Sequence, residues 1–293
     1  NISRPIDIKS LPIPNRDLVD LKDYLNIRAV QSSRGCVNQC YFCSVNGYWG
    51  QWRARSASQV VEEISLLANK YQAKKIIFLE DNALLDRFRI KEICNLLIKN
   101  KIIVKLGCLA SIDTFDEATF NLMRRAGFCW VHFGAECGDD RALKDVKKNI
   151  NVNMIRTVLA KAKQLGFIVR SSWIIDLPML NKEMINNTID LILETATQEI
   201  RIHYFVPRLG SKSFEQYSEP GKMLPQYIHG DNSITPARDF TLAFVKDRVN
   251  FLLAKLKSCG YIVIRKERDY DRLKKSQATK RVSLCPLQYG VGW

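Results

Sequence analysis

The sequence predicts an α/β fold in which a parallel sheet is covered by helices, arranged as a partial (β/α)6 TIM-like barrel. Short β-branched stretches alternate with amphipathic helical stretches over residues 27–260, which is typical of repeated strand–helix units. Six units fill this span, whereas a closed barrel has eight units and about 250 residues. An open six-unit barrel therefore fits better than a closed one. A doubly wound open sheet has the same periodicity and stays as the alternative.

The expected strands are separated by helices whose ends carry local signals. We expect strands at residues 27–33, 75–80, 102–110, 129–135, 167–177 and 200–207. Ser56 followed by Gln59 forms a capping box, which predicts a helix over 57–71. Thr114 and Glu117 are expected to cap a later helix in the same way.

Composition and charge restrict the class of protein. Apolar residues make up 46% and charged residues 26%, which is ordinary for a soluble globular chain and excludes a disordered one. No apolar run approaches the roughly 20 residues of a membrane span, and residues 1–10 lack the apolar core of a secretory signal. We therefore expect a cytoplasmic protein with no membrane partner.

The formal net charge of +15, from 45 basic and 30 acidic residues, predicts either an anionic partner or simply high solubility. A nucleic-acid partner is the less favoured possibility, because no nucleic-acid-binding module is recognisable in the chain. Part of the excess lies near the end, where residues 265–281 hold eight basic and three acidic residues, a net charge of +5. A solvated basic tail is the simplest explanation of that run.

We expect three segments along the chain. Residues 1–26 resemble a linker, residues 27–260 form the partial barrel, and residues 261–293 form a basic C-terminal extension. The last barrel helix is expected to start at Thr235 and Pro236.

Three cysteines crowd into the loop that follows the first expected strand. Cys36, Cys40 and Cys43 have the spacing Cys-x3-Cys-x2-Cys, which lets three thiolates surround one small metal cluster. A four-iron cluster held by three protein ligands keeps one iron open for a cofactor or substrate. Zinc is the competing interpretation, but structural zinc takes four ligands from two spaced pairs. The chain offers no second pair, since Cys259 and Cys285 are far apart in sequence.

Strand alternation places polar side chains inside the expected barrel. The inward positions are Trp130, His132, Gly134, Glu136, Arg170, Ser172, Asp176, Arg201 and His203. Such charged groups are costly to bury, so chemistry explains them better than packing does. An internally paired salt-bridge network without chemistry is the alternative. Glu80, Asp81, Glu136 and Asp176 stand at the carboxyl ends of strands, where parallel barrels place their active sites.

The cysteine loop SRGCVNQCYFCS, with Phe42 in the aromatic slot before Cys43, resembles the signature of the radical S-adenosylmethionine (SAM) superfamily. RARSASQVVEEI, IIFLEDN, MRRAGFCWVHFGAE and WIIDLP are similar to its branch with cobalamin-binding domains. The resemblance covers about two-thirds of the chain, from SRGC to about Phe214. It implies a [4Fe–4S] cluster on Cys36, Cys40 and Cys43 whose open iron binds SAM. Reduction then cleaves SAM to a 5′-deoxyadenosyl radical that abstracts a substrate hydrogen.

The resemblance also assigns residues to the binding of SAM. Phe42 would lie by the adenine, and Glu80, Asp81 and Asn82 occupy the site of the methionine amino group. Glu136 would lie near the ribose or the carboxylate of SAM, and Arg170 would pair with the SAM carboxylate. The remaining SAM-binding positions are Ser172, Ile174, Asp176 and Val206. Asp176-Leu177-Pro178 replaces the family's Gly-Leu-Pro, which puts that backbone contact in doubt.

Three residues are candidates for the chemistry on the substrate. Cys285, in SLCPLQYG near the end of the chain, could donate a hydrogen atom to a product radical. His132 and His203 are expected in the substrate chamber. Cys94, Cys108 and Cys129 lie on helix- or strand-patterned stretches and are expected to be small core residues.

The resemblance favours hydrogen abstraction from a peptide, such as an acidic precursor of a ribosomal natural product, or from another natural-product intermediate. The expected partners are a flavodoxin- or ferredoxin-like reductant and a separate substrate-presenting protein. The alternatives are a cobalamin-dependent methyltransferase whose cobalamin domain is absent from this chain, an RNA-modifying enzyme, and a non-catalytic iron–sulfur protein. About 26 residues precede the barrel, whereas a compact domain needs about 50, so we expect this chain not to bind cobalamin.

Overall fold

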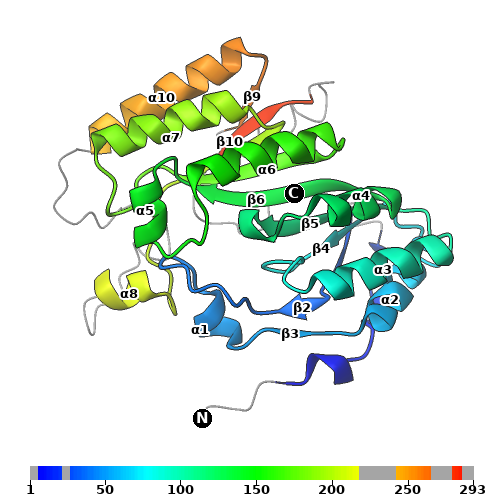
Figure 1. The fold of residues 1–293 in the computed structure, drawn as a ribbon. Coiled ribbons are helices and arrows are strands. Elements are labelled where there is room, and N and C mark those ends of the chain that lie inside the picture. The colour runs from blue at the N-terminus through cyan, green and yellow to red at the C-terminus, as the bar shows by residue number, and fades with distance from the viewer. Residues whose placement is uncertain (1–5, 22–26, 218–241, 265–278, 286–293) are drawn as a thin grey trace. The chain divides into compact units, whose positions relative to one another are not determined.

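The computed structural model describes residues 6–21, 27–217, 242–264 and 279–285, and in them parallel strands alternate with helices (Figure 1). All six predicted strands are present, as β1 (Arg28–Val30), β4 (Lys75–Phe78), β5 (Lys105–Ser111), β6 (Phe128–Glu136), β7 (Ile168–Ile174) and β8 (Glu199–His203). The registers of β1 with β4, β4 with β5, and β7 with β8 are parallel. The predicted α/β fold with a parallel sheet is confirmed.

Two further strands, β9 (Ile262–Ile264) and β10 (Arg281–Cys285), were not predicted. β10 pairs in parallel with both β8 and β9, so the last strand of the chain lies between two earlier ones. Val282 of β10 and Ile264 of β9 are buried. The expected helix start at Thr235 and Pro236 lies outside the described residues, as do 265–278 of the basic run.

The chain divides into two units. Unit 1 comprises Asn1–Val37, Val45–His132 and Lys161–Phe167, and unit 2 comprises Asn38–Ser44, Phe133–Ala160 and Ile168–Trp293. Strand β6 contributes residues to both. Each unit is described by itself below.

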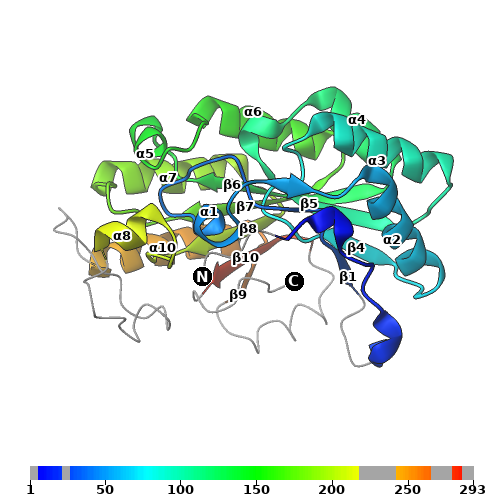
Figure 2. The same ribbon diagram turned by 90° about the horizontal axis from the view of Figure 1, so that it is seen from below.

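In unit 1 the neighbouring strands β1, β4 and β5 are accompanied by three long helices. These are α2 (Ala57–Asn69), α3 (Arg87–Lys99) and α4 (Glu117–Arg125), which pack side by side in that order (Figure 2). The apolar residues Ile90, Ile93 and Leu97 of α3 are buried, and Cys94 and Cys108 are fully buried core residues, as expected. Cys129 is only half-buried. The shorter elements are η1 (Ile8–Ser10), η2 (Arg16–Leu18), β2 (Ser33–Arg34), α1 (Val45–Trp49), β3 (Arg53–Ala54) and η4 (Ile112–Thr114).

The predicted capping box of α2 is confirmed. The Gln59 N–H donates to the Ser56 hydroxyl at 3.3 Å, and the Ser56 N–H donates to the Gln59 side chain at 3.1 Å. The predicted cap of α4 is wrong by two residues. Asp116 caps this helix by accepting the Thr119 N–H at 2.9 Å, whereas the Thr114 hydroxyl donates to the carbonyl of residue 111.

Unit 2 holds β7, β8, β10 and β9 with the helices α5 (Asp140–Asp145), α7 (Lys182–Thr195), α8 (Lys212–Tyr217) and α10 (Leu242–Ser258), and the first part of α6 (Val152–Gln164). Helices α7 and α10 pack together. In β7 the predicted alternation holds, since Val169 and Trp173 are buried. The expected strand 200–207 is shorter in the structure. It ends at His203, and beyond it Phe205 is buried whereas Tyr204 and Val206 are half-buried.

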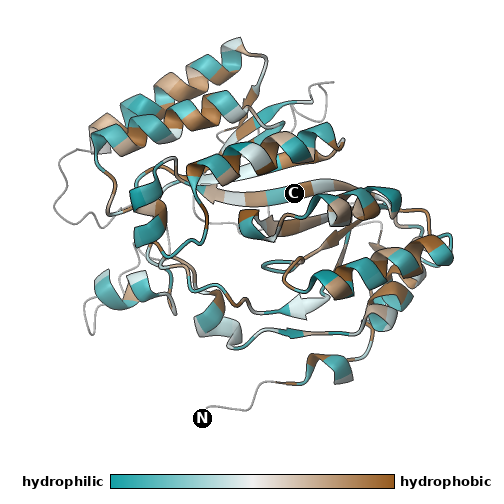
Figure 3. Cartoon of the chain, viewed as in Figure 1, coloured by the Kyte–Doolittle hydropathy of each residue, from teal (hydrophilic) through white to brown (hydrophobic). Residues whose placement is uncertain are grey.

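The hydropathy of the elements agrees with this packing. In Figure 3 strands β4 and β5 are largely hydrophobic, while the long helices alternate between hydrophobic and hydrophilic residues. A helix that covers a sheet with one face and meets water with the other has this pattern. Within the described part of the chain, no helix is long and apolar enough to cross a membrane.

Candidate functional site

The segment before Cys36 in unit 1 has a tightly fixed backbone. β2 pairs antiparallel with β3, with Ser33 opposite Ala54. Gly35 follows with φ of +85°, and a Cβ there would lie 3.0 Å from the carbonyl oxygen of Gln51. Only glycine meets both conditions without strain. Cys36 comes next and is half-buried.

Cys40 and Cys43, in unit 2, lie on a turn that is anchored at its centre. The Cys43 N–H donates to the Cys40 carbonyl at 3.0 Å, which closes the turn. Between them, Tyr41 donates its N–H to the Val146 carbonyl at 2.9 Å and accepts the Ser213 N–H at 3.0 Å. Two backbone hydrogen bonds thus hold the loop between the two half-buried cysteines.

The donor set fits an iron–sulfur cluster better than a single metal ion. Cys36, Cys40, Phe42 and Cys43 are all half-buried, and thiolates are the usual ligands of such clusters. Among the described residues, no three Cys, His, Asp or Glu side chains form a site for one metal ion. The thiolate chemistry and the spacing in sequence, rather than an observed arrangement of the three sulfur atoms, support the prediction of a cluster.

Glu80, which follows β4 in unit 1, is already bonded within the protein. The Ser32 hydroxyl donates to one carboxylate oxygen at 2.6 Å, and the Ser33 hydroxyl donates to the other. Burial raises the pKa of the Glu80 carboxyl, while the charge of Arg89 and the two hydroxyls oppose that rise. Both oxygens of Glu80 thus have partners before any ligand binds.

Asp81 and Asn82 differ in their burial and in the hydrogen-bonding groups that stay available. Asp81 is exposed. Asn82 is 2% exposed, and its Oδ1 accepts the Leu84 N–H at 3.2 Å. The Nδ2 of Asn82 and the hydroxyl of Ser111, at the end of β5, are buried and have no hydrogen-bond partner among the residues described. Such groups are costly without a partner, so they suit a polar ligand at these strand ends.

Ser111 was not predicted. Strand alternation indicates which side chains are buried, but it does not indicate which buried hydroxyl lacks a partner.

Glu136 ends β6 in unit 2 and forms an ion pair that the sequence did not predict. Its Oε1 lies 2.8 Å from the Lys148 Nζ, and both side chains are about nine-tenths buried. The φ of Glu136 is +68°, so its side chain leaves the strand at an unusual angle. A Cβ at Gly134 would overlap the carboxylate, which explains the glycine there.

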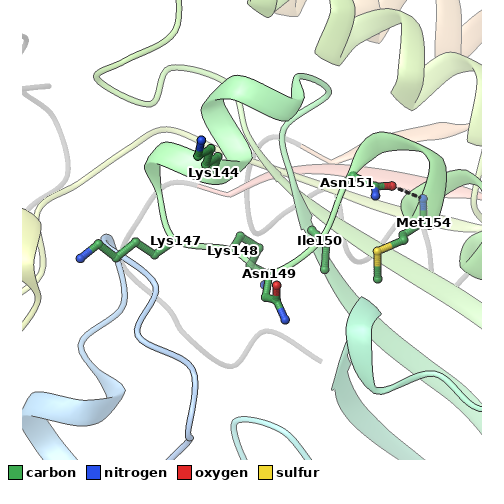
Figure 4. Close-up of a pocket in the computed structure, with 7 residues that line it drawn as sticks. All are labelled: Lys144, Lys147, Lys148, Asn149, Ile150, Asn151 and Met154. Carbon is green, nitrogen blue, oxygen red and sulfur yellow. Dashed lines mark hydrogen bonds between the residues drawn. The ribbon is translucent and has the colours of Figure 1, made fainter.

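A pocket of about 400 Å³ lies beside this ion pair in unit 2. It is lined by Lys144, Lys147, Lys148, Asn149, Ile150, Asn151 and Met154. Figure 4 shows that Lys144 and Lys147 point in different directions, while Asn151 accepts the Met154 N–H at 2.8 Å. The lysines do not converge on one point, so the pocket has a basic lining without a fixed anion-binding geometry.

The structure gives Arg170 a different partner from the predicted one. Its Nη2 lies 2.5 Å from an oxygen of Glu199, whose other oxygen pairs with Arg281. Arg170 is 3% exposed, and burial lowers its pKa to about 10. It lies near the amino end of β7, in register with Glu199 at the start of β8. Cofactor sites of parallel barrels lie at the other strand ends, so this placement favours a structural ion pair for Arg170, and its contact with SAM stays a prediction.

Asp176 joins two loops of unit 2. It is 1% exposed, and its carboxylate accepts the Phe205 N–H at 2.5 Å. The segment after β7 is thereby held to the segment after β8, where Val206 is half-buried. Ser172 and Ile174 are half-buried as well, on the side of β7 opposite Trp173.

The predicted chamber residues are distributed over both units. His132 is half-buried in unit 1, with its ring 6.0 Å from that of Trp130. His203 is half-buried at the end of β8 in unit 2, where burial and the charges of Arg201 and Arg208 lower its pKa to about 4. Cys285 is in register with His203 on the neighbouring strand β10. The placement of the Cys285 side chain lies outside what the structure describes.

Comparison with known proteins gives a family match and several relatives. The model of the Radical SAM superfamily matches residues 30–192. An uncharacterized methyltransferase of Pyrococcus horikoshii is 26% identical over 259 residues, which are 86% of this chain and 56% of that protein. The cytidylyl-2-hydroxyethylphosphonate methyltransferase of Streptomyces wedmorensis is 27% identical over 187 residues, 59% of this chain and 35% of that protein. The chain thus spans about half or less of these relatives.

Solved structures share the fold. The radical SAM methyltransferase TsrM of Kitasatospora setae, with cobalamin and a [4Fe–4S] cluster bound, superposes with a TM-score of 0.62 at 14% identity, over 68% of this chain and 41% of TsrM. The cobalamin-dependent SAM radical enzyme OxsB, with aqua-cobalamin and SAM bound, gives a TM-score of 0.60 at 16% identity, over 96% of this chain and 35% of OxsB.

Proposed function

The chain belongs to the radical SAM superfamily, and on this premise we propose that Cys36, Cys40 and Cys43 hold a [4Fe–4S] cluster with SAM at its fourth iron. The cluster, when bound, supplies one electron to the sulfonium of SAM, which splits into methionine and a 5′-deoxyadenosyl radical that abstracts a substrate hydrogen. The observation that carries this proposal is the cysteine loop, with three half-buried thiols at a spacing suited to a cluster.

The protein's own residues bind and orient SAM in this proposal. The Asn82 Nδ2 and the Ser111 hydroxyl are buried without a partner among the described residues, so they are ready to bond a polar ligand. The amide suits a carboxylate oxygen, because it donates, and the hydroxyl suits either a donor or an acceptor. In unit 2 the Glu136 carboxylate, oriented by Lys148, is the acidic group proposed to bind SAM.

We propose an anionic organic substrate, such as an acidic peptide or a natural-product intermediate. The net charge of +15 supports this class. The basic lining of the pocket beside Glu136 also supports it. The reductant is proposed to be a small flavodoxin- or ferredoxin-like protein.

Methyl transfer is the second candidate outcome, favoured by the names of the relatives. Two of the proteins compared above are called methyltransferases, and the chain spans only 56% and 35% of them. TsrM, also a methyltransferase, binds cobalamin. In this candidate the reaction proceeds with cobalamin held outside the residues described here.

Reconstitution under anaerobic conditions tests the main proposal. The protein should take up about four irons and four sulfides per chain and release 5′-deoxyadenosine when dithionite and SAM are added. Cys36→Ala, Cys40→Ala and Cys43→Ala should each abolish both, whereas the exposed Cys259 gives the matched control Cys259→Ala, which should keep both. Stoichiometric zinc in place of iron would contradict the proposal.

SAM labelled with deuterium in its methyl group separates the two outcomes. Hydrogen abstraction alone leaves the label in methionine, whereas methyl transfer moves it to the product.

A further inference from the structure

Glu80, which follows β4, has contacts that binding of SAM does not require. Glu80 is 6% exposed, and its two oxygens accept the hydroxyls of Ser32 and Ser33. A buried carboxylate is costly unless it is fully hydrogen-bonded, and these serines satisfy it. Ser33 lies three residues before Cys36 in the same unit. Glu80 thus connects the end of β4, through hydrogen bonds, to the segment that precedes Cys36.

Arg89 on α3 completes this buried network. Its Nη2 donates to the Ser32 carbonyl at 2.9 Å and also to the Ser32 hydroxyl, while its Nε donates to the Arg55 carbonyl at 2.9 Å. Because the Ser32 oxygen accepts from Arg89, the hydroxyl hydrogen is directed to Glu80. The guanidinium also balances the charge of the buried carboxylate. In this network of Glu80, Ser32, Ser33 and Arg89, each hydrogen bond therefore has a defined donor and a defined acceptor.

The backbone of the same segment is also restricted. Gly35, the residue directly before Cys36, has a positive φ and lies close to the Gln51 carbonyl. The Ser32 carbonyl accepts the Arg55 N–H at 2.9 Å. Side-chain and backbone contacts therefore restrain residues 32, 33 and 35.

We propose that Glu80 is a positioning residue for Cys36, which fixes Ser32 and Ser33 so that the Cys36 thiolate is held in place for the cluster. This inference rests on the proposed function, in which Cys36 is a cluster ligand. It assigns the methionine end of SAM to Asn82 rather than to Glu80, because Asn82 retains a donor with no partner among the described residues.

Hydrogen exchange of the cluster-free protein tests the contacts of Glu80 without reference to activity. The double variant Ser32→Ala/Ser33→Ala, which removes both hydroxyl contacts of Glu80, should speed exchange of the amides of residues 33–36 by about tenfold or more. Ser171→Ala is the control, because Ser171 is a buried serine of unit 2 whose hydroxyl accepts the Trp173 Nε1–H, so its loss should not change exchange at residues 33–36. Unchanged exchange in the double serine variant would overturn the proposal.

Spectroscopy of the reconstituted protein tests the effect on the cluster. The double variant Ser32→Ala/Ser33→Ala keeps the Glu80 carboxylate but removes its contacts. We expect this variant and Glu80→Gln to share an altered electron paramagnetic resonance spectrum of the reduced cluster without SAM, and faster loss of iron.

A different pattern of results would show that Glu80 binds SAM directly and does not position Cys36. In that case Glu80→Gln weakens SAM binding by about tenfold or more with an unchanged spectrum, and the serine variant behaves as wild type. A wild-type protein that takes up no cluster would instead contradict the proposed function, and the exchange experiment would still test the contacts of Glu80. The serine variant, which removes only two hydroxyls, keeps the test available if Glu80→Gln does not fold.

Discussion

Arg170 and Glu199 form a buried ion pair across β7 and β8, and the second oxygen of the same carboxylate binds Arg281 of β10. One carboxylate therefore joins three strands of unit 2. β10 reaches this position from 82 residues further along the chain than Glu199. Removal of one partner is expected to be destabilising, because it leaves the other charge buried.

We predict that Glu199→Gln destabilises the protein by about 3 kcal/mol, because Arg170 is left buried without a counter-charge. The melting temperature by calorimetry should fall by several degrees. Glu194→Gln is the control, since Glu194 pairs with Arg156 on the surface with both side chains about half exposed. That change should cost less than about 1 kcal/mol. Equal losses in the two variants would mean that the buried pair contributes no more than a surface pair.

The sequence predicted the strands and helices well where the signal is local. The capping box of Ser56 and Gln59 needs only four residues, and the alternation of β7 needs only one strand. β10 was missed because its place depends on pairing with β8, a contact between distant parts of the chain. The cap of α4 was misplaced because two capping patterns overlap, one from Thr114 and one from Asp116.

The part of the candidate site that could be predicted is the set of possible cluster ligands, because the spacing of the cysteines in sequence indicates them. The three cysteines are recognisable from eight residues of sequence, and their exposure in the structure agrees with a ligand role. The sequence analysis missed Arg89, Ser111 and Lys148. Arg89 and Lys148 matter through partners that are distant in sequence, and Ser111 matters because its buried hydroxyl has no partner among the described residues. For Arg170 the strand alternation correctly predicted the side of β7. It could not predict the ion pair with Glu199, which lies on a different strand.

A second prediction concerns Glu136 and Lys148. Glu136→Gln should weaken SAM binding by about tenfold, because the amide lacks the negative charge that Lys148 orients at 2.8 Å. Iron content should stay unchanged, since Glu136 is no cluster ligand. Anaerobic equilibrium binding of SAM measures the effect, with the exposed Glu183 mutated to Gln as control. Wild-type affinity in Glu136→Gln would remove this residue from the site.

A third prediction uses the Ser111 hydroxyl, which has no hydrogen-bond partner within the described residues. Ser111→Ala should leave the stability of the SAM-free protein unchanged or slightly higher, because it removes an unsatisfied buried group. Binding of SAM should become weaker. Ser171→Ala gives the contrast, since the Ser171 hydroxyl accepts the Trp173 Nε1–H at 2.8 Å. That variant should lose about 1 kcal/mol or more of stability. A loss of stability in SAM-free Ser111→Ala would show that the hydroxyl has a partner in the protein.

The last prediction concerns pH and His203. Burial, with Arg201 and Arg208 nearby, lowers the pKa of His203 to about 4, so the folded protein holds this imidazole neutral below the usual His pKa near 6.5. The unfolded chain takes up a proton as the pH falls below about 6.5, and the folded protein does not until about 4. His203 therefore reduces stability progressively between these values, by about 1.4 kcal/mol per pH unit at most. His203→Gln cannot be protonated, so its free energy of unfolding should fall less than that of wild type over this window. Urea unfolding at pH 7, 6 and 5 measures the difference. Parallel curves for the two proteins would show that His203 titrates normally and is open to solvent.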